Sequence, residues 1–300
     1  MDYLGSVYAF LTAVGFKVNL LTQRLVQEKG AAPIDTYTIY RYALIPSAIW
    51  SLIFVRKEDI LFVLHNSELL IIFGIIIVLW NLQALIMSFV INSTSSMVLF
   101  STFFNMMLLP LFLLFGTFYN HDIPNTLSII SIAILIIALS IKPTPHKENL
   151  RPHLSKPLYV ILLLIFAKAC CDAVLQGVGR EALQHISPVV FLGEFSFVTL
   201  AVCAIISKFY IHRRTPETEA MKKNRWFVIT LMPLTWFLAS IPEAFALAAI
   251  PIYTFISITV ITFGMDTFSD VIHKRIHINF QTISFLLLVV AGISLSVLSV

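Results

Sequence analysis

Residues 158–176, LYVILLLIFAKACCDAVLQ, form an almost continuous apolar run that is interrupted by Lys168 and Asp172. One helix needs about 20 mostly apolar residues to cross a bilayer, whereas the strands of a membrane barrel alternate over segments of about 10 residues. The continuous run predicts a membrane helix. Its two opposite charges stand at i and i+4, which places them on the same helix face.

Similar apolar runs recur along the whole chain. Of its 300 residues, 58% are hydrophobic and 12% are charged, which is more apolar surface than one soluble core can bury. We therefore expect an all-α, multi-pass membrane protein in the lipid bilayer of a bacterial inner (plasma) membrane. Ten transmembrane helices are predicted at residues 3–25, 37–54, 69–90, 97–118, 126–141, 158–176, 188–206, 226–247, 251–271 and 280–298.

The spacing of these runs predicts an internal duplication. The last five runs begin at a nearly constant interval of about 155 residues after the first five. Because five is an odd number, the second set must cross the membrane in the opposite sense to the first. We thus expect two inverted five-helix repeats, 1–141 and 158–300, joined by a basic loop at 142–157. Secondary transporters commonly have this arrangement, with the substrate site near the midplane between the repeats.

Three segments resemble a known family. They are PIDTYTIYRYALIPSAIW (33–50), FNMMLLPLFLLFGTFYNHDIPNTLSIISIAILIIALSI (104–141) and FQTISFLLLVVAGISLS (280–296). They are similar to the EamA-like members of the drug/metabolite transporter (DMT) superfamily, in which a Pro-led helix carries an Arg-aromatic pair and a Pro-centred fourth helix leads through a short polar turn into a fifth. The resemblance implies a ten-helix transporter whose cavity is lined by helices one, three, four, six, eight and nine.

The basic residues are distributed unevenly between the two sides of the predicted bundle. The side that holds both termini carries three outside the helices, Arg56, Lys57 and Arg180, and the opposite side carries fourteen. The positive-inside rule makes the fourteen-charge side cytoplasmic and leaves the termini outside, whereas the family resemblance implies termini in the cytosol. The basic loops are explained by topology, so the net charge of +4 suggests no nucleic-acid partner.

Charged residues inside a membrane are costly and commonly face a bundle interior or a wet cavity. Lys17 and Asp172 stand at equivalent positions of the two repeats. One hypothesis is that Lys17, Lys168 and Asp172 meet at the cavity and bind a charged solute or a proton. The alternative is that Lys168 and Asp172 neutralise each other as a structural pair while Lys17 snorkels to the interface.

Other polar residues within the runs are candidates for coupling or for substrate binding. Glu243 follows Pro242, which frees a backbone carbonyl beside the acid, so Glu243 is a candidate for proton coupling, as are Asp172 and Asp266. Amides and rings near mid-helix are typical of solute contact or of helix packing. Besides Lys17, Lys168 and Asp172, the substrate-binding candidates are Trp80, Asn81, Gln83, Asn105 and Trp236.

The cysteines and one acidic pair raise the question of metal chemistry. Cys170, Cys171 and Cys203 fall within predicted helices with no His within a turn of the adjacent pair, so we expect helix packing, no metal and no cofactor. Asp266 and Asp270 stand at i and i+4, as in a Mg²⁺-dependent membrane prenyltransferase. Such an enzyme needs a second Asp-rich motif, which the sequence lacks.

The sequence therefore favours a transporter over an enzyme. We expect a secondary transporter that moves a small polar or amphipathic metabolite by alternating access, with a proton as the possible coupling ion. Mixed charges and aromatic residues fit an amino acid, an organic cation or a phosphorylated metabolite equally well.

Overall fold

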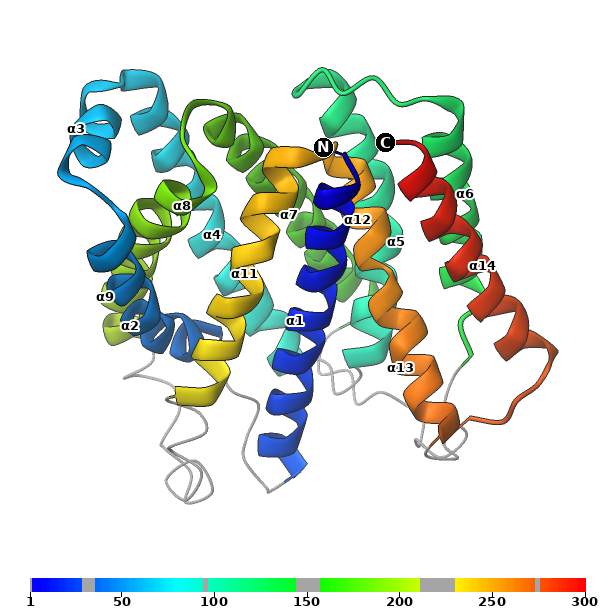
Figure 1. Ribbon diagram of the computed structural model, residues 1–300. Coiled ribbons are helices and arrows are strands. Elements are labelled where there is room, and N and C mark those ends of the chain that lie inside the picture. The colour runs from blue at the N-terminus through cyan, green and yellow to red at the C-terminus, as the bar shows by residue number, and fades with distance from the viewer. Residues whose placement is uncertain (1, 29–35, 94–96, 144–156, 211–229, 273–275) are drawn as a thin grey trace.

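The computed structural model describes residues 2–28, 36–93, 97–143, 157–210, 230–272 and 276–300. Within these ranges the regular structure is helical and contains no strand. The helices are α1 Asp2–Glu28, α2 Thr36–Phe54, α3 Lys57–His65, α4 Ser67–Ser93, α5 Met97–Phe118, α6 Thr126–Ser140, α7 Leu158–His185, α8 Pro188–Val190, η1 Phe191–Phe195, α9 Ser196–Tyr210, α11 Met232–Ala249, α12 Ile252–Thr259, α13 Ile261–Ile272 and α14 Phe280–Leu298 (Figure 1).

Several of these helices have the length and composition of membrane spans. Within the described ranges, four pass on both counts: Leu158–His185, Pro188–Ile206, Ile252–Ile272 and Phe280–Leu298. A fifth is added if α3 and the first part of α4, which are bent by 92° to each other, are taken together. Shorter apolar helices lie at Tyr42–Phe54, Thr102–Phe118, Thr126–Ser140 and Pro233–Ala249. The chain therefore has the helices of a membrane protein.

Each of the ten predicted ranges overlaps a helix, although residues 226–229 of the eighth lie outside the described residues. Two local predictions were wrong. α3 occupies a segment that we expected to be a connecting loop; Glu58 and Asp59 in its first turn suit the positive end of a helix, and Asp59 accepts the backbone N–H of Arg56 at 3.0 Å. α7 continues to His185, past the predicted end at residue 176, because EALQ at 181–184 propagates the helix.

Two further helices depart from regular geometry beside the cavity described below. The seventh predicted helix contains a π-helical segment, η1, between α8 and α9. The ninth is divided at Val260 into α12 and α13. Neither feature was predicted, and π-helical turns occur frequently at functional sites.

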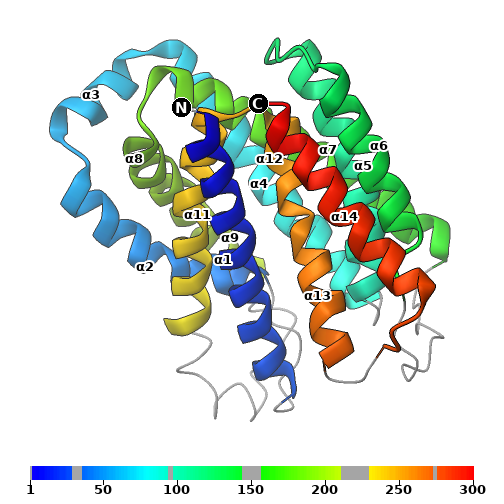
Figure 2. The same cartoon turned by 45° about the vertical axis from the view of Figure 1, so that its right-hand side comes forward.

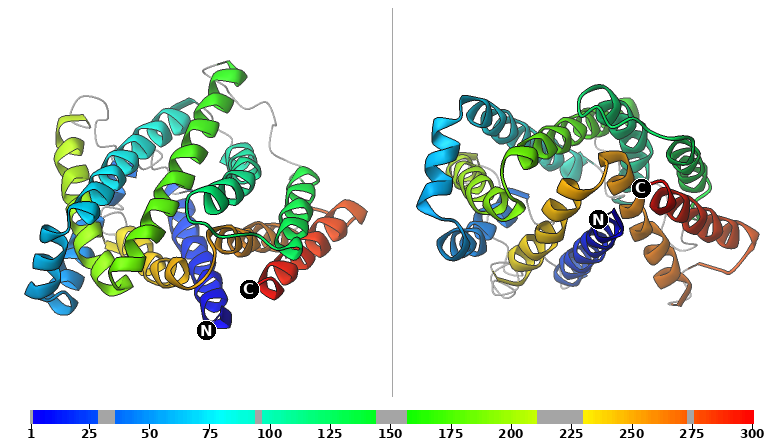
Figure 3. Two further views of the ribbon diagram at one scale, coloured as in Figure 1. Left: turned by 90° about the horizontal axis from the view of Figure 1, so that it is seen from above. Right: turned by 45° about the horizontal axis from the view of Figure 1, so that its top comes forward.

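The helices pack as a bundle in which neighbours in space are distant in sequence. α1 packs against α11, α4 against α7, α2 against α9 and α6 against α14. α1 and α11 lie side by side, as do α6 and α14 (Figure 2). Seen from above, α2, α3 and α9 form one edge of the bundle, while α6 and α14 form the other (Figure 3). Both termini lie at the same end of the bundle (Figure 1).

Close contact between α1 and α11 depends on Gly15. A Cβ at Gly15 would lie 2.8 Å from Cβ and 3.0 Å from Cα of Ala239, which cannot move without separating the helices. We expect Gly15→Ala to destabilise the protein by about 1–3 kcal/mol, measured by unfolding in detergent. Gly74→Ala is the matched control, because nothing lies within 4 Å of a Cβ there. Equal losses from both variants would contradict the close packing.

Candidate functional site

A cavity of about 480 Å³ lies in the centre of the bundle. Its walls come from α1, α4, α5, α7, η1, α9, α11 and α12, so helices from both halves of the sequence contribute. The structure brings together seven of the residues that the sequence singled out. These are Trp80, Gln83, Asn105, Lys168, Asp172, Trp236 and Glu243.

Lys168 and Asp172 form an ion pair on the cavity-facing side of α7. Nζ of Lys168 lies 2.7 Å from Oδ2 of Asp172 and 4.0 Å from the centre of the Phe104 ring on α5. The lysine side chain is buried. The ammonium is therefore neutralised by its own helix and also contacts an aromatic face, which is favourable for a cation.

Lys17 lies elsewhere and does not join this pair. Its Nζ forms an ion pair with Oδ1 of Asp266 on α13, and neither residue lines the cavity. Lys17 is only 8% exposed, so it does not snorkel. The hypothesis that Lys17, Lys168 and Asp172 meet was wrong, because Lys17 is paired with Asp266 on α13 and not with the residues of α7. Asp266 is held by Lys17, and Asp270, the second acid of the DTFSD segment, is partly buried on the same helix.

Glu243 is the third charged residue of the cavity. Its Oε1 accepts a hydrogen bond of 2.8 Å from Nε2 of Gln176 on α7. No lysine or arginine of the described residues forms an ion pair with Glu243. The charged groups that line the described part of the cavity are thus one lysine and two carboxylates, and the lysine is paired with Asp172.

Aromatic rings form one wall of the cavity. The ring centres of Trp80 and Trp236 are 5.6 Å apart, those of Trp80 and Phe195 are 5.5 Å apart, and those of Phe195 and Phe191 are 4.6 Å apart. Phe191 and Phe195 come from η1. The sequence did not single out Phe191 and Phe195, because one Phe among 25 carries no distinguishing signal. Gln176, at the end of the predicted sixth helix, was not singled out either.

Asn81 is not among the residues that line the cavity, and its side chain joins α4 to α9. Its Nδ2 donates to the carbonyl of Ile77 at 2.8 Å, and its Oδ1 accepts from Sγ of Cys203 at 3.4 Å. The amide therefore takes the helix-packing role that was the alternative to substrate contact. Cys203 is likewise buried between helices, as its packing interpretation requires.

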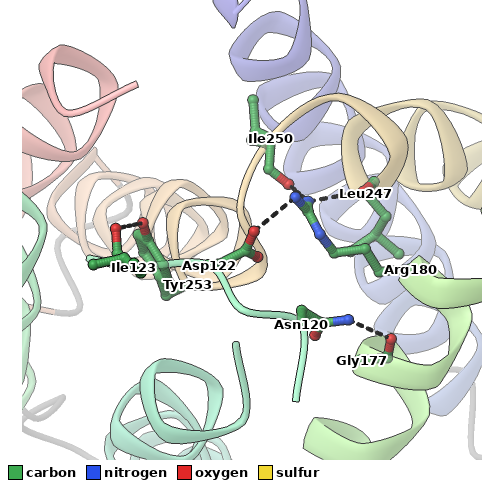
Figure 4. Close-up of polar contacts among 8 residues, drawn as sticks. All are labelled: Asn120, Asp122, Ile123, Gly177, Arg180, Leu247, Ile250 and Tyr253. Carbon is green, nitrogen blue, oxygen red and sulfur yellow. Dashed lines mark hydrogen bonds and ion pairs between the residues drawn. The ribbon is translucent and has the colours of Figure 1, made fainter. Parts of the chain in front are cut away.

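Arg180, in the last part of α7, is the centre of a polar network (Figure 4). Its guanidinium donates to the carbonyls of Leu247, at 3.1 Å, and of Ile250, and to Oδ1 of Asp122 at 3.0 Å. Leu247 also lines the cavity. The network joins α7, the break between α11 and α12, and the loop that follows α5. Arg180 therefore lies in a helix, whereas the count of basic residues on each side of the membrane had treated it as part of a loop.

Further contacts tie the α5–α6 loop to the same place. Nδ2 of Asn120 donates to the carbonyl of Gly177 at 3.0 Å, and the hydroxyl of Tyr253 donates to the carbonyl of Ile123 at 3.5 Å (Figure 4). Burial raises the pKa of Asp122, while Arg180 and the backbone N–H of Ile252 oppose this shift. The α5–α6 loop is thus held against α7 and α12 by hydrogen bonds and by the Arg180–Asp122 ion pair.

One cluster of side chains with metal-ligand chemistry lies outside the cavity. Glu68 at the start of α4 and Glu181 and His185 near the end of α7 have ligand atoms within 4.8 Å of one another. His185 Nε2 lies 3.8 Å from Glu181 Oε1. Sequence reasoning did not predict this cluster, because its acids are 113 positions apart in the chain.

Comparisons with known proteins show that the fold is shared with solved structures. No family model and no curated protein matches the chain. Among solved structures, 27 chains match. One of them, described as "Crystal structure of protein", superposes with a TM-score of 0.74 over 99% of this chain and 98% of its own, at 12% sequence identity. At this identity the likeness shows a shared fold alone.

Proposed function

We propose that the protein is a secondary transporter, similar to EamA-like members of the DMT superfamily, that moves a small polar or amphipathic metabolite across a membrane by alternating access. The observation that carries the proposal is the central cavity, which combines a paired lysine, a second acid and an aromatic wall. Small-molecule sites are typically concave and mostly apolar, with a few convergent polar groups. We place the protein in the inner membrane of a bacterium.

The helix packing supports two inverted five-helix repeats. α8, η1 and α9 count as one helix and α12 with α13 as another, and the short helix α3, within the first repeat, is not counted. The pairing of α1 with α11 then becomes the pairing of α7 with α4 when the repeats are exchanged. The α2–α9 and α6–α14 contacts map onto themselves. This pattern is expected of a twofold relation between repeats 1–141 and 158–300, although most of the connecting loop lies outside the described residues.

Individual residues also fit the inverted relation. Trp80 and Trp236 are 156 positions apart, close to the repeat interval, and their rings touch at 5.6 Å. Residues that a twofold axis relates and that also touch must lie beside the axis. The cavity wall formed by the two tryptophans is therefore where a site between repeats is expected.

The two buried lysines, Lys17 and Lys168, also connect equivalent helices of the two repeats. Lys17 links α1 to α13 through Asp266, and Lys168 links α7 to α5 through the Phe104 ring. α1 and α7 are equivalent helices of the two repeats, as are the α12–α13 pair and α5. Both repeats thus use a buried lysine to hold equivalent helices together, with different partners.

The partners of the three acids favour Glu243 for proton coupling. Asp172 and Asp266 each have a lysine partner, whereas Glu243 accepts from the neutral amide of Gln176. A proton that binds Glu243 neutralises a charge without breaking an ion pair. Binding at Asp172 or Asp266 would leave an unpaired lysine in the membrane, which is costly.

Uptake into proteoliposomes tests the proposal. A metabolite library is first screened by thermal shift; a ligand at 100 times its Kd stabilises the folded protein by about 2.7 kcal/mol. The best ligand is then offered with and without an imposed pH gradient. We expect the gradient to change the initial rate and accumulation in the wild type but not in Glu243→Gln. Glu68→Gln is the control, because Glu68 is an exposed acid outside the cavity. Equal uptake by the wild type under both conditions would exclude proton coupling.

A further inference from the structure

We infer that the ligand of the central cavity is a small organic cation with one positive charge and an apolar body, and that Glu243 is its counterion. This inference rests on the proposed function, because it names the class of solute that the same cavity takes. The sequence left three classes of solute open, namely an amino acid, an organic cation and a phosphorylated metabolite, and the inference selects the organic cation.

The charges that line the cavity indicate the charge of the ligand. Lys168 and Asp172 cancel at a separation of 2.7 Å, which leaves Glu243 as the uncompensated charge among the described lining residues. Oε1 of Glu243 accepts from Gln176, and Oε2 accepts no hydrogen bond from the described residues. A carboxylate in a site of low dielectric is neutralised either by the proton proposed above or by a counter-charge. A single cation supplies it.

Anionic and zwitterionic ligands fit the cavity less well. A carboxylate or phosphate group needs a cation, and Lys168 is the basic residue among the described lining residues. Its ammonium is already bonded to Asp172 and lies 4.0 Å from the centre of the Phe104 ring. An anion would have to displace Asp172 and would also be repelled by Glu243.

The aromatic residues define where the rest of the ligand lies. Trp236, Ser240 and Glu243 all line the cavity from α11, at positions i, i+4 and i+7 on one helix face. The rise of seven residues separates the two ends of this face by about 10 Å. A cationic group at Glu243 therefore allows an apolar body to extend toward Trp236 and the adjoining ring of Trp80, which offer aromatic surface for apolar contact.

Four probes of similar size and different charge test the inference. They are 2-phenylethylamine (cation), phenylalanine (zwitterion), 3-phenylpropionate (anion) and 2-phenylethanol (neutral), each titrated at pH 7 into purified protein in lipid nanodiscs by calorimetry. We expect the amine to bind at least about tenfold more tightly than the other three, since hydrogen bonds to charged groups are worth that much. Failure of the amine to bind, or equal or tighter binding of any other probe, would overturn the inference.

Variants locate the cation within the cavity. Glu243→Gln is expected to weaken amine binding by about tenfold or more and to leave phenylethanol unchanged. Trp236→Leu is expected to weaken it by about threefold to tenfold, which gives an independent readout if Glu243→Gln does not fold. Glu68→Gln is the matched control. Unchanged amine binding in a folded Glu243→Gln variant would overturn the inference.

Binding and transport together distinguish the two proposals. Amine that binds but is never exchanged across a proteoliposome membrane would contradict the transporter and leave the ligand class in place. Uptake of phenylalanine or of phenylpropionate, without amine binding, would support the transporter and overturn the ligand class.

Discussion

Replacing Arg180 with Ala is expected to lower the free energy of unfolding by about 3 kcal/mol, because it removes one partner of a largely buried charge pair and leaves Asp122 without its cation. It also removes the donor to the carbonyls of Leu247 and Ile250 at the break between α11 and α12. Chemical unfolding in detergent measures the loss. Arg180→Lys keeps the positive charge but loses the planar guanidinium group that donates to several acceptors at once. An intermediate loss of stability is therefore expected.

The matched control is Arg56→Ala. Arg56 precedes α3, is exposed, and its side chain makes no capping hydrogen bond, so the loss of stability in this variant is expected to be within about 0.5 kcal/mol. The double variant Arg180→Ala/Asp122→Ala should be less destabilised than the sum of the single variants, because neither charge is then left alone. Losses that are equal for Arg180→Ala and Arg56→Ala would show that the network does not hold the helices together.

The second large effect is expected at the cavity pair. Asp172→Asn leaves Lys168 as an unpaired cation within the membrane, at a cost of about 2.5–3.5 kcal/mol on insertion scales, and Lys168→Met leaves Asp172 unpaired at a similar cost. The double variant Lys168→Met/Asp172→Asn carries neither charge, and we expect it to regain most of the lost stability. Unfolding of the four proteins in detergent gives the coupling energy between the two residues.

Transport by the double variant decides the role of the pair. If Lys168 and Asp172 neutralise each other, the folded double variant retains uptake, because Glu243 and the aromatic wall are intact. A double variant that folds like the wild type but does not transport would contradict this role and would place the pair in contact with the solute.

The features that the sequence predicted are those that depend on residues close to one another in the chain. Helix positions follow from continuous apolar runs, and the Lys168–Asp172 pair follows from i, i+4 spacing on one helix. Lys17 and Asp266 are 249 positions apart, and nothing in either segment specifies the other. The acceptors of Arg180 are mostly backbone carbonyls, which every residue has and which therefore leave no pattern in the sequence.

The structure changes the orientation argument in one respect. Arg180 belongs to a polar network within the bundle, so the count predicted from the sequence becomes two basic residues on the terminal side, Arg56 and Lys57, against fourteen on the other side. The positive-inside rule then places the termini outside the cytoplasm more strongly. A protease-cleavable tag at the C-terminus, tested in intact cells, should be cut from outside; a tag that is cut only after lysis would support the opposite orientation.

Alternating access is the central claim, and accessibility from both sides of the membrane tests it most directly. Ser240 lines the cavity and is replaced by Cys in a variant whose three native cysteines are changed to Ala. A membrane-impermeant methanethiosulfonate reagent is then applied to oriented vesicles from one face or from the other. We predict modification of the new thiol from each face separately, with rates that a bound ligand shifts in opposite directions. Modification from a single face, unchanged by ligand, would contradict the transporter.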